Sequence, residues 1–168
     1  YNYDDYDRFW YTPNDNNDWT QLSVSIPADS ISQNSYKPPA IVSSTAVAPV
    51  NASAPLVIKM EEPEDQSNQF YVYMHFMKIQ VLAKNQTREF SITQNGELWY
   101  KKISQYLSAT TIYTPSATSW KEIQFSLEMT QNSTLPPIIN AIEIYRALEF
   151  QQSDIFQGDG MPRKNMIS

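Results

Sequence analysis

The chain has 168 residues, with 12 Lys and Arg against 18 Asp and Glu, so its formal net charge at pH 7 is −6. This length suits one domain of β-sandwich size, and the acidic balance excludes nucleic acid as a partner and disfavours an anionic membrane surface. The chain holds no Cys, which removes disulfides, zinc–thiolate sites and cysteine nucleophiles. Aromatic residues make up 13% of the chain while Gly occurs only three times, a composition typical of packed β-structure with rings at its edges.

Short β-rich segments predict the strands of the first third of the chain. They are Thr20–Ile26, Ile41–Val47 and Leu56–Met60. A polar loop that ends at Pro38-Pro39 separates the first two, and the acidic turn Glu61–Asp65 follows the third. No segment here or later has the pattern of a convincing helix.

The most informative stretch is Phe70–Leu82. Its two alternating sets are Phe70, Val72, Met74 and Phe76 on one side and Tyr71, Tyr73, His75 and Met77 on the other. Because a strand turns successive side chains to opposite faces, this stretch predicts a strand that is apolar on both faces and lies inside a sandwich.

The segments that follow complete the sheets. Arg88–Tyr100 predicts strand, turn and strand, with Asn95-Gly96 supplying the positive φ of a tight hairpin. Further strands are expected at Thr110–Thr114, Glu122–Met129 and Ile138–Tyr145. About eight strands without a helix predict an all-β chain, an antiparallel β-sandwich of jelly-roll type. Its predicted core contains Phe70, Val72, Met74, Phe76, Phe90, Ile92, Phe125, Leu127, Ile142 and Ile144, and Ile123 and Met129 are also expected to point inward.

Three blocks of sequence, read together, resemble the malectin-like domain of plant leucine-rich-repeat receptor-like kinases, and specifically its second lobe. The blocks are Phe70–Leu82, Arg88–Tyr100 and Ser133–Tyr145, and the resemblance runs from Tyr6–Trp10 to Tyr145. We therefore expect a malectin-like lobe at residues 1–147. The pattern dissolves after Ala147, so residues 148–168 are expected to form a disordered tail.

The resemblance also implies a location and partners. It implies a non-catalytic glycoprotein module at the extracellular face of the plasma membrane, as part of a receptor or as a secreted fragment, next to a second malectin-like lobe and leucine-rich repeats. The chain itself has no apolar run long enough for membrane insertion and no kinase motif. The ligand implied is a cell-wall oligosaccharide or a peptide. A protein-interaction or spacer role in receptor assembly is the alternative, and no cofactor is expected.

Three N-glycosylation sequons support a secretory location by their position. They begin at Asn51, Asn85 and Asn132, and each falls in a predicted turn between strands, where a bulky glycan is tolerated.

Other residues that could carry chemistry favour structural roles. His75 is the single His, without the second ligand that a zinc site needs or the spacing of a catalytic triad, so a packed, hydrogen-bonded His is expected. The acidic clusters Asn14–Asp18 and Glu61–Asp65 lack the spacing of a calcium loop, and nothing places them as paired carboxylates in a cleft. Neither a metal site nor a catalytic site is predicted.

Aromatic residues near predicted strand ends are the best candidates for ligand contact, because rings stack on sugar C–H groups while nearby polar groups bind hydroxyls. They are Trp10, Tyr11, Trp19, Trp99, Tyr100, Tyr106 and Trp120. Alternatively, these rings close the ends of the sandwich. The predicted ligand-binding surface is the edge of the Asn95-Gly96 turn, with Asn95, Glu97, Trp99 and Tyr100.

Overall fold

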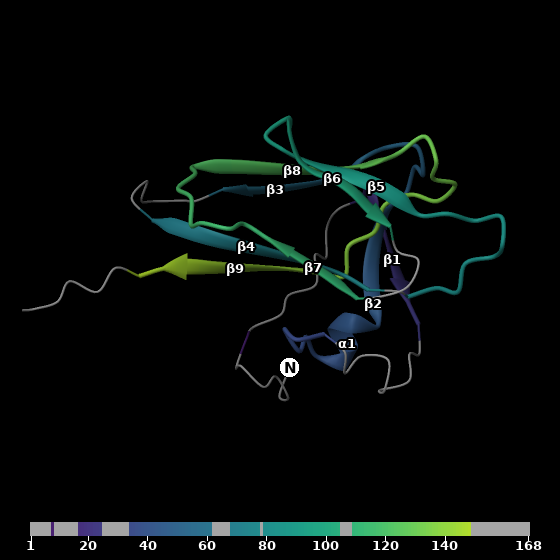
Figure 1. Ribbon diagram of the computed structural model, residues 1–168, viewed down its shortest axis with the longest axis horizontal. Coiled ribbons are helices and arrows are strands. Elements are labelled where there is room, and N and C mark those ends of the chain that lie inside the picture. The colour runs from purple at the N-terminus through teal and green to yellow at the C-terminus, as the bar shows by residue number, and fades with distance from the viewer. Residues whose placement is uncertain are drawn as a thin grey trace, which may run out of the picture.

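The computed structural model describes residue 8 and residues 17–24, 34–61, 68–77, 79–104 and 109–148. Within these residues the chain forms nine strands and one short helix (Figure 1). The elements are β1 (Trp19–Ser23), α1 (Ala40–Ser43), β2 (Thr45–Pro49), β3 (Leu56–Glu61), β4 (Gln69–Phe76), β5 (Glu89–Gln94), β6 (Glu97–Ser104), β7 (Thr110–Tyr113), β8 (Glu122–Met129) and β9 (Ala141–Ala147). The predicted all-β class is confirmed.

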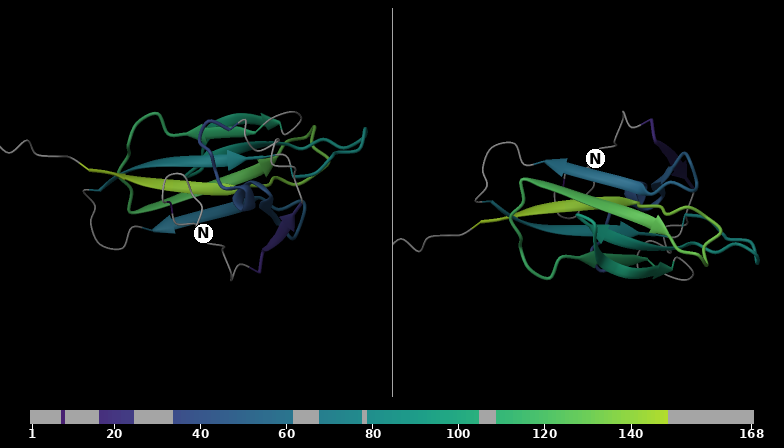
Figure 2. Two further views of the ribbon diagram at one scale, coloured as in Figure 1. Left: turned by 90° about the horizontal axis from the view of Figure 1, so that it is seen from below. Right: turned by 90° about the horizontal axis from the view of Figure 1, so that it is seen from above.

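Two antiparallel sheets form the sandwich. One sheet has the strand order β3-β8-β5-β6 and the other β7-β4-β9, while β1 and β2 pair as a separate ribbon. Figure 1 shows the two sheets as an upper and a lower layer, and Figure 2 shows their strands running along the long axis of the molecule. This is the predicted antiparallel β-sandwich of jelly-roll type.

The core lies between the two sheets, where the period-two pattern predicted it. Eight of the ten predicted core residues are buried: Phe70, Val72, Met74, Phe76, Phe90, Ile92, Phe125 and Leu127. Phe76 and Phe90 bring together the two sheets, with ring centroids 5.4 Å apart. A second, smaller cluster of Ala46, Ala48, Ile79 and Ile138 lies beside β2, with Leu22 of β1 packed against it.

The prediction was wrong at strand edges. Ile144 is 42% exposed and Met129 is 40% exposed, and Ile142 is only partly buried against the core. Ile142 and Ile144 pair with Met74 and Val72 in register. However, β9 is the edge strand of its sheet, so neighbouring side chains cover its inward residues incompletely. Met129 is the last residue of β8, where the overlap of the strands ends.

The predicted strand Ile41–Val47 is confirmed only from Thr45, where β2 begins, and the prediction that no helix forms was wrong. The backbone N–H of Ser43 donates to Pro39 O at 2.9 Å, and that of Ser44 donates to Ala40 O at 2.9 Å, which closes one helical turn before β2 begins. The Thr45 hydroxyl donates to Ile41 O at 3.0 Å and strengthens the turn. Pro39 is the N-cap residue, with an extended ψ of 150°, and its carbonyl accepts the first hydrogen bond of the turn.

Other element limits are shorter than predicted. β1 ends at Ser23, and Ile26 lies outside the described residues. β4 ends at Phe76, because the Asn140 side chain accepts the backbone N–H of Met77 at 2.7 Å and ends its pairing. Val81, in the second half of the predicted strand, is 90% exposed.

The predicted hairpin is confirmed. Asn95 and Gly96 have φ of 50° and 83°, the left-handed values that a tight two-residue hairpin turn requires. The Asn95 backbone N–H donates to Gln124 O at 2.8 Å, and its side-chain oxygen accepts the Gln124 N–H at 2.8 Å. The turn is thus fixed to β8 as well as to its own strands.

Some predictions fall outside the described residues. These include the tail after Leu148, the acidic cluster Asn14–Asp18 except for its last two residues, and Glu61–Asp65 except for Glu61. Among the described residues, no helix has the length and apolar character needed to span a bilayer.

Candidate functional site

The outer face of the sheet β7-β4-β9 carries a cluster of four tyrosines. Because Phe70, Val72, Met74 and Phe76 fill the core, the alternate residues of β4 point away from it. The register then aligns Tyr73 with Tyr113 of β7 and Tyr71 with Tyr145 of β9. We call the cluster of Tyr71, Tyr73, Tyr113 and Tyr145 the tyrosine face.

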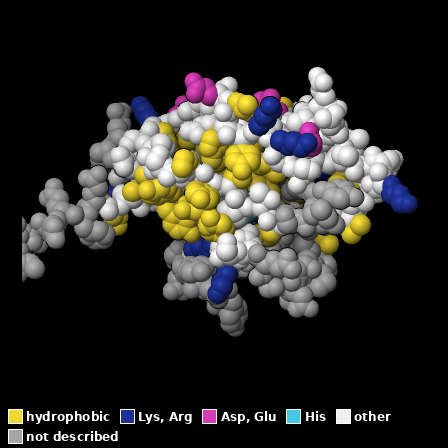
Figure 3. Space-filling model, in the orientation of Figure 1, with side chains coloured by type: hydrophobic (Ala, Val, Ile, Leu, Met, Phe, Trp, Pro, Cys, Tyr) yellow, Lys and Arg dark blue, Asp and Glu magenta, His cyan; other side chains and the backbone are white. Residues whose placement is uncertain are grey.

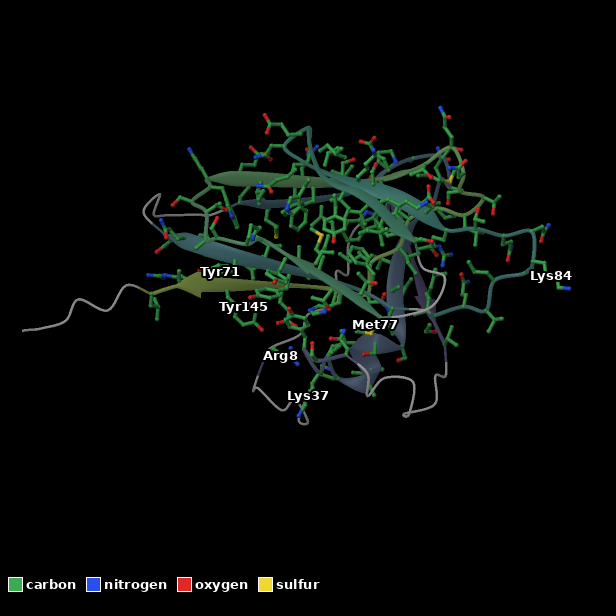
Figure 4. All side chains as sticks on the ribbon, viewed as in Figure 1. Arg8, Lys37, Tyr71, Met77, Lys84 and Tyr145 are labelled. Carbon is green, nitrogen blue, oxygen red and sulfur yellow. The ribbon has the colours of Figure 1, made fainter. Side chains whose placement is uncertain are left out.

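The rings of the tyrosine face support one another. Tyr73 and Tyr113 stack with centroids 5.3 Å apart and planes at 20°, and Tyr145 meets Tyr73 edge-on at 5.4 Å and 87°. Tyr36 packs on Tyr73 at 5.6 Å. Tyr113 remains 49% exposed and Tyr145 42%. Figure 3 shows side chains of the hydrophobic class, which includes Tyr, gathered over β4 and β9, where Figure 4 labels Tyr71 and Tyr145.

A polar network centred on Glu143 lies beside the tyrosine face, on the same side of the sheet. Its Oε1 accepts hydrogen bonds from Arg8 Nη1 at 2.7 Å and from His75 Nε2 at 2.9 Å. Its Oε2 accepts a hydrogen bond from the Tyr145 hydroxyl. Arg8 also donates to the carbonyls of Tyr36 and Lys37, at 3.1 and 2.7 Å, so it joins the 34–37 segment to the sheet (Figure 4).

The network continues on the other side of His75. The Asn34 amide donates to the Thr111 hydroxyl at 3.2 Å, and that hydroxyl lies 2.9 Å from His75 Nδ1. Since the Glu143 carboxylate is an acceptor, His75 donates from Nε2 and its Nδ1 accepts from Thr111. Asn34, Thr111, His75 and Glu143 are therefore linked by consecutive hydrogen bonds, as a buried polar network requires.

The electrostatics of the network follow from its contacts. Burial alone would raise the pKa of Glu143, but hydrogen bonds from His75 and Tyr145 and the charge of Arg8 outweigh it and lower that pKa. Burial, together with the hydrogen bond to Glu143, raises the pKa of Tyr145 to about 12. Burial and the neighbouring tyrosines also raise the pKa of Tyr73. At neutral pH the phenols of Tyr73 and Tyr145 are thus neutral, beside a carboxylate that is paired with Arg8.

The hydroxyl, imidazole and carboxylate of Thr111, His75 and Glu143 stand in the order of a hydrolytic triad. However, His75 is 0% exposed, and the Thr111 hydroxyl also accepts the Asn34 amide. A catalytic base must be able to serve a bound substrate, and His75 is fully buried while Thr111 is only partly exposed. The predicted role of His75, a packed and hydrogen-bonded side chain, is confirmed. Within the described residues, no group of three or more His, Asp or Glu gathers as metal ligands would.

The four residues of the predicted hairpin surface lie in different environments. Asn95 and Glu97 are exposed, and Tyr100 is 42% exposed. Trp99 is half-buried and packs on Phe125, with ring centroids 5.2 Å apart. The hairpin belongs to the sheet β3-β8-β5-β6, so this surface and the tyrosine face lie on different sheets.

Where the structure describes them, the other predicted rings favour the alternative, in which rings close the ends of the sandwich. Trp19 and Trp120 pack against the core, and Trp120 lies 4.7 Å from Phe70. Trp10, Tyr11 and Tyr106 lie outside the described residues. The tyrosine face was not predicted as a site, although Tyr71 and Tyr73 on one face of a strand, and Glu143 and Tyr145 on one face of another, are visible in the sequence.

The three sequon asparagines Asn51, Asn85 and Asn132 are all at exposed positions. Asn51 lies in the turn before β3, Asn85 precedes β5, and Asn132 follows β8. The register places the start of β3 and the start of β5 beside the end of β8, so all three lie at one end of this sheet.

Comparison with known proteins gives consistent results at the levels of sequence and fold. The family model of the malectin-like domain matches residues 1–147. A probable LRR receptor-like protein kinase of Arabidopsis thaliana, At1g51890, is 40% identical over 163 residues, which cover 95% of this chain and 18% of the relative. The chain therefore spans less than a fifth of that relative's length.

Two solved structures share the fold. The plant receptor-like kinase FER superposes with a TM-score of 0.54 at 16% identity, over 75% of this chain and 39% of that one. A structure of the plant peptide RALF23 in complex with FER and LLG2 superposes with a TM-score of 0.51 at 17% identity, over 75% of this chain and 38% of that one.

Proposed function

Because the chain belongs to the malectin-like domain family, whose model matches residues 1–147, we propose that it is a non-catalytic, carbohydrate-binding recognition module from the extracellular part of a plant receptor-like kinase. The single observation that carries the carbohydrate proposal is the tyrosine face. Exposed rings beside polar groups suit sugar, whereas a flat apolar patch suits a protein partner.

The tyrosine face offers both kinds of contact that a sugar needs. The exposed rings of Tyr113 and Tyr145 present apolar surface to pyranose C–H groups, and their hydroxyls offer hydrogen bonds. The stacking of Tyr73 on Tyr113 and the bond from Tyr145 to Glu143 hold both rings in position before binding. Such preorganisation reduces the entropy lost on association.

The affinity should be low. Two rings and a few hydroxyl contacts exceed the cost of association by a small margin, so we expect a Kd of about 0.1–1 mM for an oligosaccharide of the cell wall. Proteins of low affinity commonly gain avidity from neighbouring modules. An adjacent malectin-like lobe and leucine-rich repeats are the proposed neighbours.

The hairpin surface of Asn95, Glu97, Trp99 and Tyr100 remains a second proposed contact for the same ligand class. Since Trp99 packs on Phe125, Tyr100 is the ring there that is available for stacking. The two surfaces lie on different sheets, so substitutions can separate them.

A peptide or protein partner is the second proposed function. It is favoured by one neighbour of the same fold, FER, whose structure in complex with the peptide RALF23 and LLG2 superposes on this chain. In that case the module would serve receptor assembly or peptide recognition together with a neighbouring lobe.

A glycan array with the folded chain tests the proposal, in parallel with the Tyr113→Ala and Tyr100→Ala variants. Signal on glucose or pectin oligosaccharides that falls in Tyr113→Ala supports binding at the tyrosine face. A fall in Tyr100→Ala alone would move the site to the hairpin. An array without signal, also when a neighbouring lobe is attached, would favour the peptide or protein partner.

A further inference from the structure

The sequons at Asn85 and Asn132 are joined to each other in the folded chain through their third residues, Thr87 and Thr134. The Thr87 N–H donates to the Thr134 hydroxyl at 2.9 Å, and the Thr134 N–H donates to Thr87 O at 2.9 Å. The Thr87 hydroxyl donates to Asn132 O at 2.6 Å. Each sequon is therefore a structural partner of the other.

The middle residue of the second sequon strengthens this joint. Ser133 is buried, and its hydroxyl accepts the Glu89 N–H at 2.8 Å and donates to Leu135 O at 2.8 Å. The Thr130 hydroxyl donates to the Glu89 carboxylate at 2.8 Å. The segment that leaves β8 is thus fixed to the start of β5 by side chains and backbone alike.

Asn51 lies in a different environment. Its side-chain oxygen accepts the Ser53 N–H at 3.1 Å, and its carbonyl accepts the Ala54 N–H at 2.9 Å, which makes a local, exposed turn. Among the described residues, the Ser53 hydroxyl has no hydrogen-bond partner. This sequon contributes nothing to the joining of strands.

N-glycosylation requires the groups that the joined sequons use. The Asn side-chain nitrogen attacks C1 of an oligosaccharide carried on a polyprenyl diphosphate; the C1–O bond breaks, the diphosphate leaves with its electron pair, and the nitrogen loses one proton to a base. The transferase recognises the hydroxyl of the third residue. In the folded chain the hydroxyls of Thr87 and Thr134 are engaged and their backbones are paired.

We propose that Asn85 and Asn132 are glycosylated as a pair before the chain folds, whereas Asn51 remains an acceptor in the folded chain. Glycosylation of these sites in the plant rests on the proposed extracellular location. Once attached, both glycans fit the fold, because Asn85 and Asn132 are exposed.

The glycans would crowd one end of the sandwich and leave the tyrosine face open. In Figure 4, Lys84, the neighbour of Asn85, lies at the right-hand end, whereas Tyr71 and Tyr145 lie toward the left. The pair of glycans therefore excludes the end formed by the start of β5 and the end of β8 as a protein interface.

The test compares the folded, unglycosylated chain with peptides of the same chain that each carry one sequon. Both are incubated with an oligosaccharyltransferase and a polyprenyl-diphosphate oligosaccharide, and occupancy is read at each Asn by mass spectrometry. We expect all three peptides to be modified. In the folded chain, we expect modification at Asn51, and at least about tenfold slower modification at Asn85 and Asn132, because local opening must come first. The Ser53→Ala variant should abolish modification of the folded chain at Asn51.

Equal modification rates for the folded chain and the peptides at Asn85 or Asn132 would overturn the proposal. So would a failure of the transferase to modify either peptide. If the transferase does not modify the folded chain at Asn51, the physical reason given for the proposal, the engagement of the threonine hydroxyls, would be overturned. This assay uses no ligand of the tyrosine face, so its outcome is independent of the carbohydrate proposal.

Discussion

Replacing Glu143 by Ala removes the acceptor that Arg8, His75 and Tyr145 share beside the tyrosine face. The buried Nε2–H of His75, the Arg8 guanidinium and the Tyr145 hydroxyl then lose one partner each. A buried unsatisfied donor costs about 1–3 kcal/mol, and one-sided loss of a buried ion pair costs about 3–5 kcal/mol. The side chains of Arg8 and Glu143 keep 11% and 8% exposure, so water compensates a part. We expect a loss of about 3–4 kcal/mol in the free energy of unfolding.

The Glu143→Gln variant separates charge from shape. The amide oxygen can still accept from Arg8 and His75, but the acceptor no longer carries a charge, so both bonds weaken. Because a hydrogen bond to a charged group contributes about 1.5–3 kcal/mol and a neutral one about 0.5–1.5 kcal/mol, we expect a loss of about 2 kcal/mol.

Urea unfolding followed by tryptophan fluorescence measures both variants, with an unchanged m-value as the sign that only stability has moved. Glu97→Ala, at an exposed position on the hairpin, is the matched control and should stay within about 0.5 kcal/mol of the parent chain. A Glu143→Ala midpoint equal to that of the control would refute the assignment of Glu143 as the centre of the network.

Three further predictions concern the core, the hairpin and pH. Phe76→Ala should lower the free energy of unfolding by about 3–5 kcal/mol because Phe76 is fully buried between the sheets. Ile144→Ala, at a 42% exposed position, should lower it by less than about 1 kcal/mol. Comparable urea midpoints for the two variants would contradict this. Gly96→Ala should cost about 1 kcal/mol by strain at φ 83°, although nothing lies within 4 Å of the added Cβ, and an unchanged midpoint would argue against the left-handed turn. The folded-state pKa of Tyr145, about 12, exceeds the unfolded value of about 10, so its contribution to stability is present below pH of about 10 and lost toward about 12. Tyr145→Phe should flatten this alkaline loss in a series of unfolding midpoints, and an identical loss in both proteins would show that Tyr145 does not titrate as described.

Acid also lowers stability through this network, by protonating Glu143. The pKa of Glu143 is lowered in the folded chain, so its contribution is present above the unfolded value of about 4.3 and lost as pH falls through the folded value. Glu143→Gln should therefore reduce the acid sensitivity of the unfolding midpoint as well as the midpoint at neutral pH. Equal acid slopes in the two proteins would contradict this linkage.

The strands could be predicted from the sequence because their patterning is local. Between Phe70 and Phe76, apolar residues alternate with Tyr or His, and Asn95-Gly96 favours a hairpin turn by its own conformational preference. The one-turn helix α1 could not be predicted in this way. Four residues carry little periodicity, and the turn is also held by a residue from outside it. The Asn140 amide, 97 positions away, donates to Ser43 O at 3.3 Å.

The tyrosine face shows the same limit for the candidate site. The spacing of Tyr71, Tyr73 and His75 placed them on one face of a strand, but their partners lie far away in sequence. Glu143 is 68 positions from His75 and 135 from Arg8. These neighbours depend on the order β7-β4-β9 and on its register, which period-two patterning does not encode. The same holds for Trp99, whose packing on Phe125 required the pairing of β5 with β8.

An amide chemical-shift titration of the isotope-labelled chain tests most directly whether the tyrosine face binds carbohydrate. Oligosaccharides of glucose and of pectin are added to millimolar concentration, and the shifted amides are located on the structure. We expect shifts that saturate with a Kd of about 0.1–1 mM, gather in β4, β7 and β9 around Tyr113 and Tyr145, and disappear in Tyr113→Ala. Shifts confined to the hairpin around Tyr100, or no shift at millimolar ligand, would contradict carbohydrate binding at the tyrosine face.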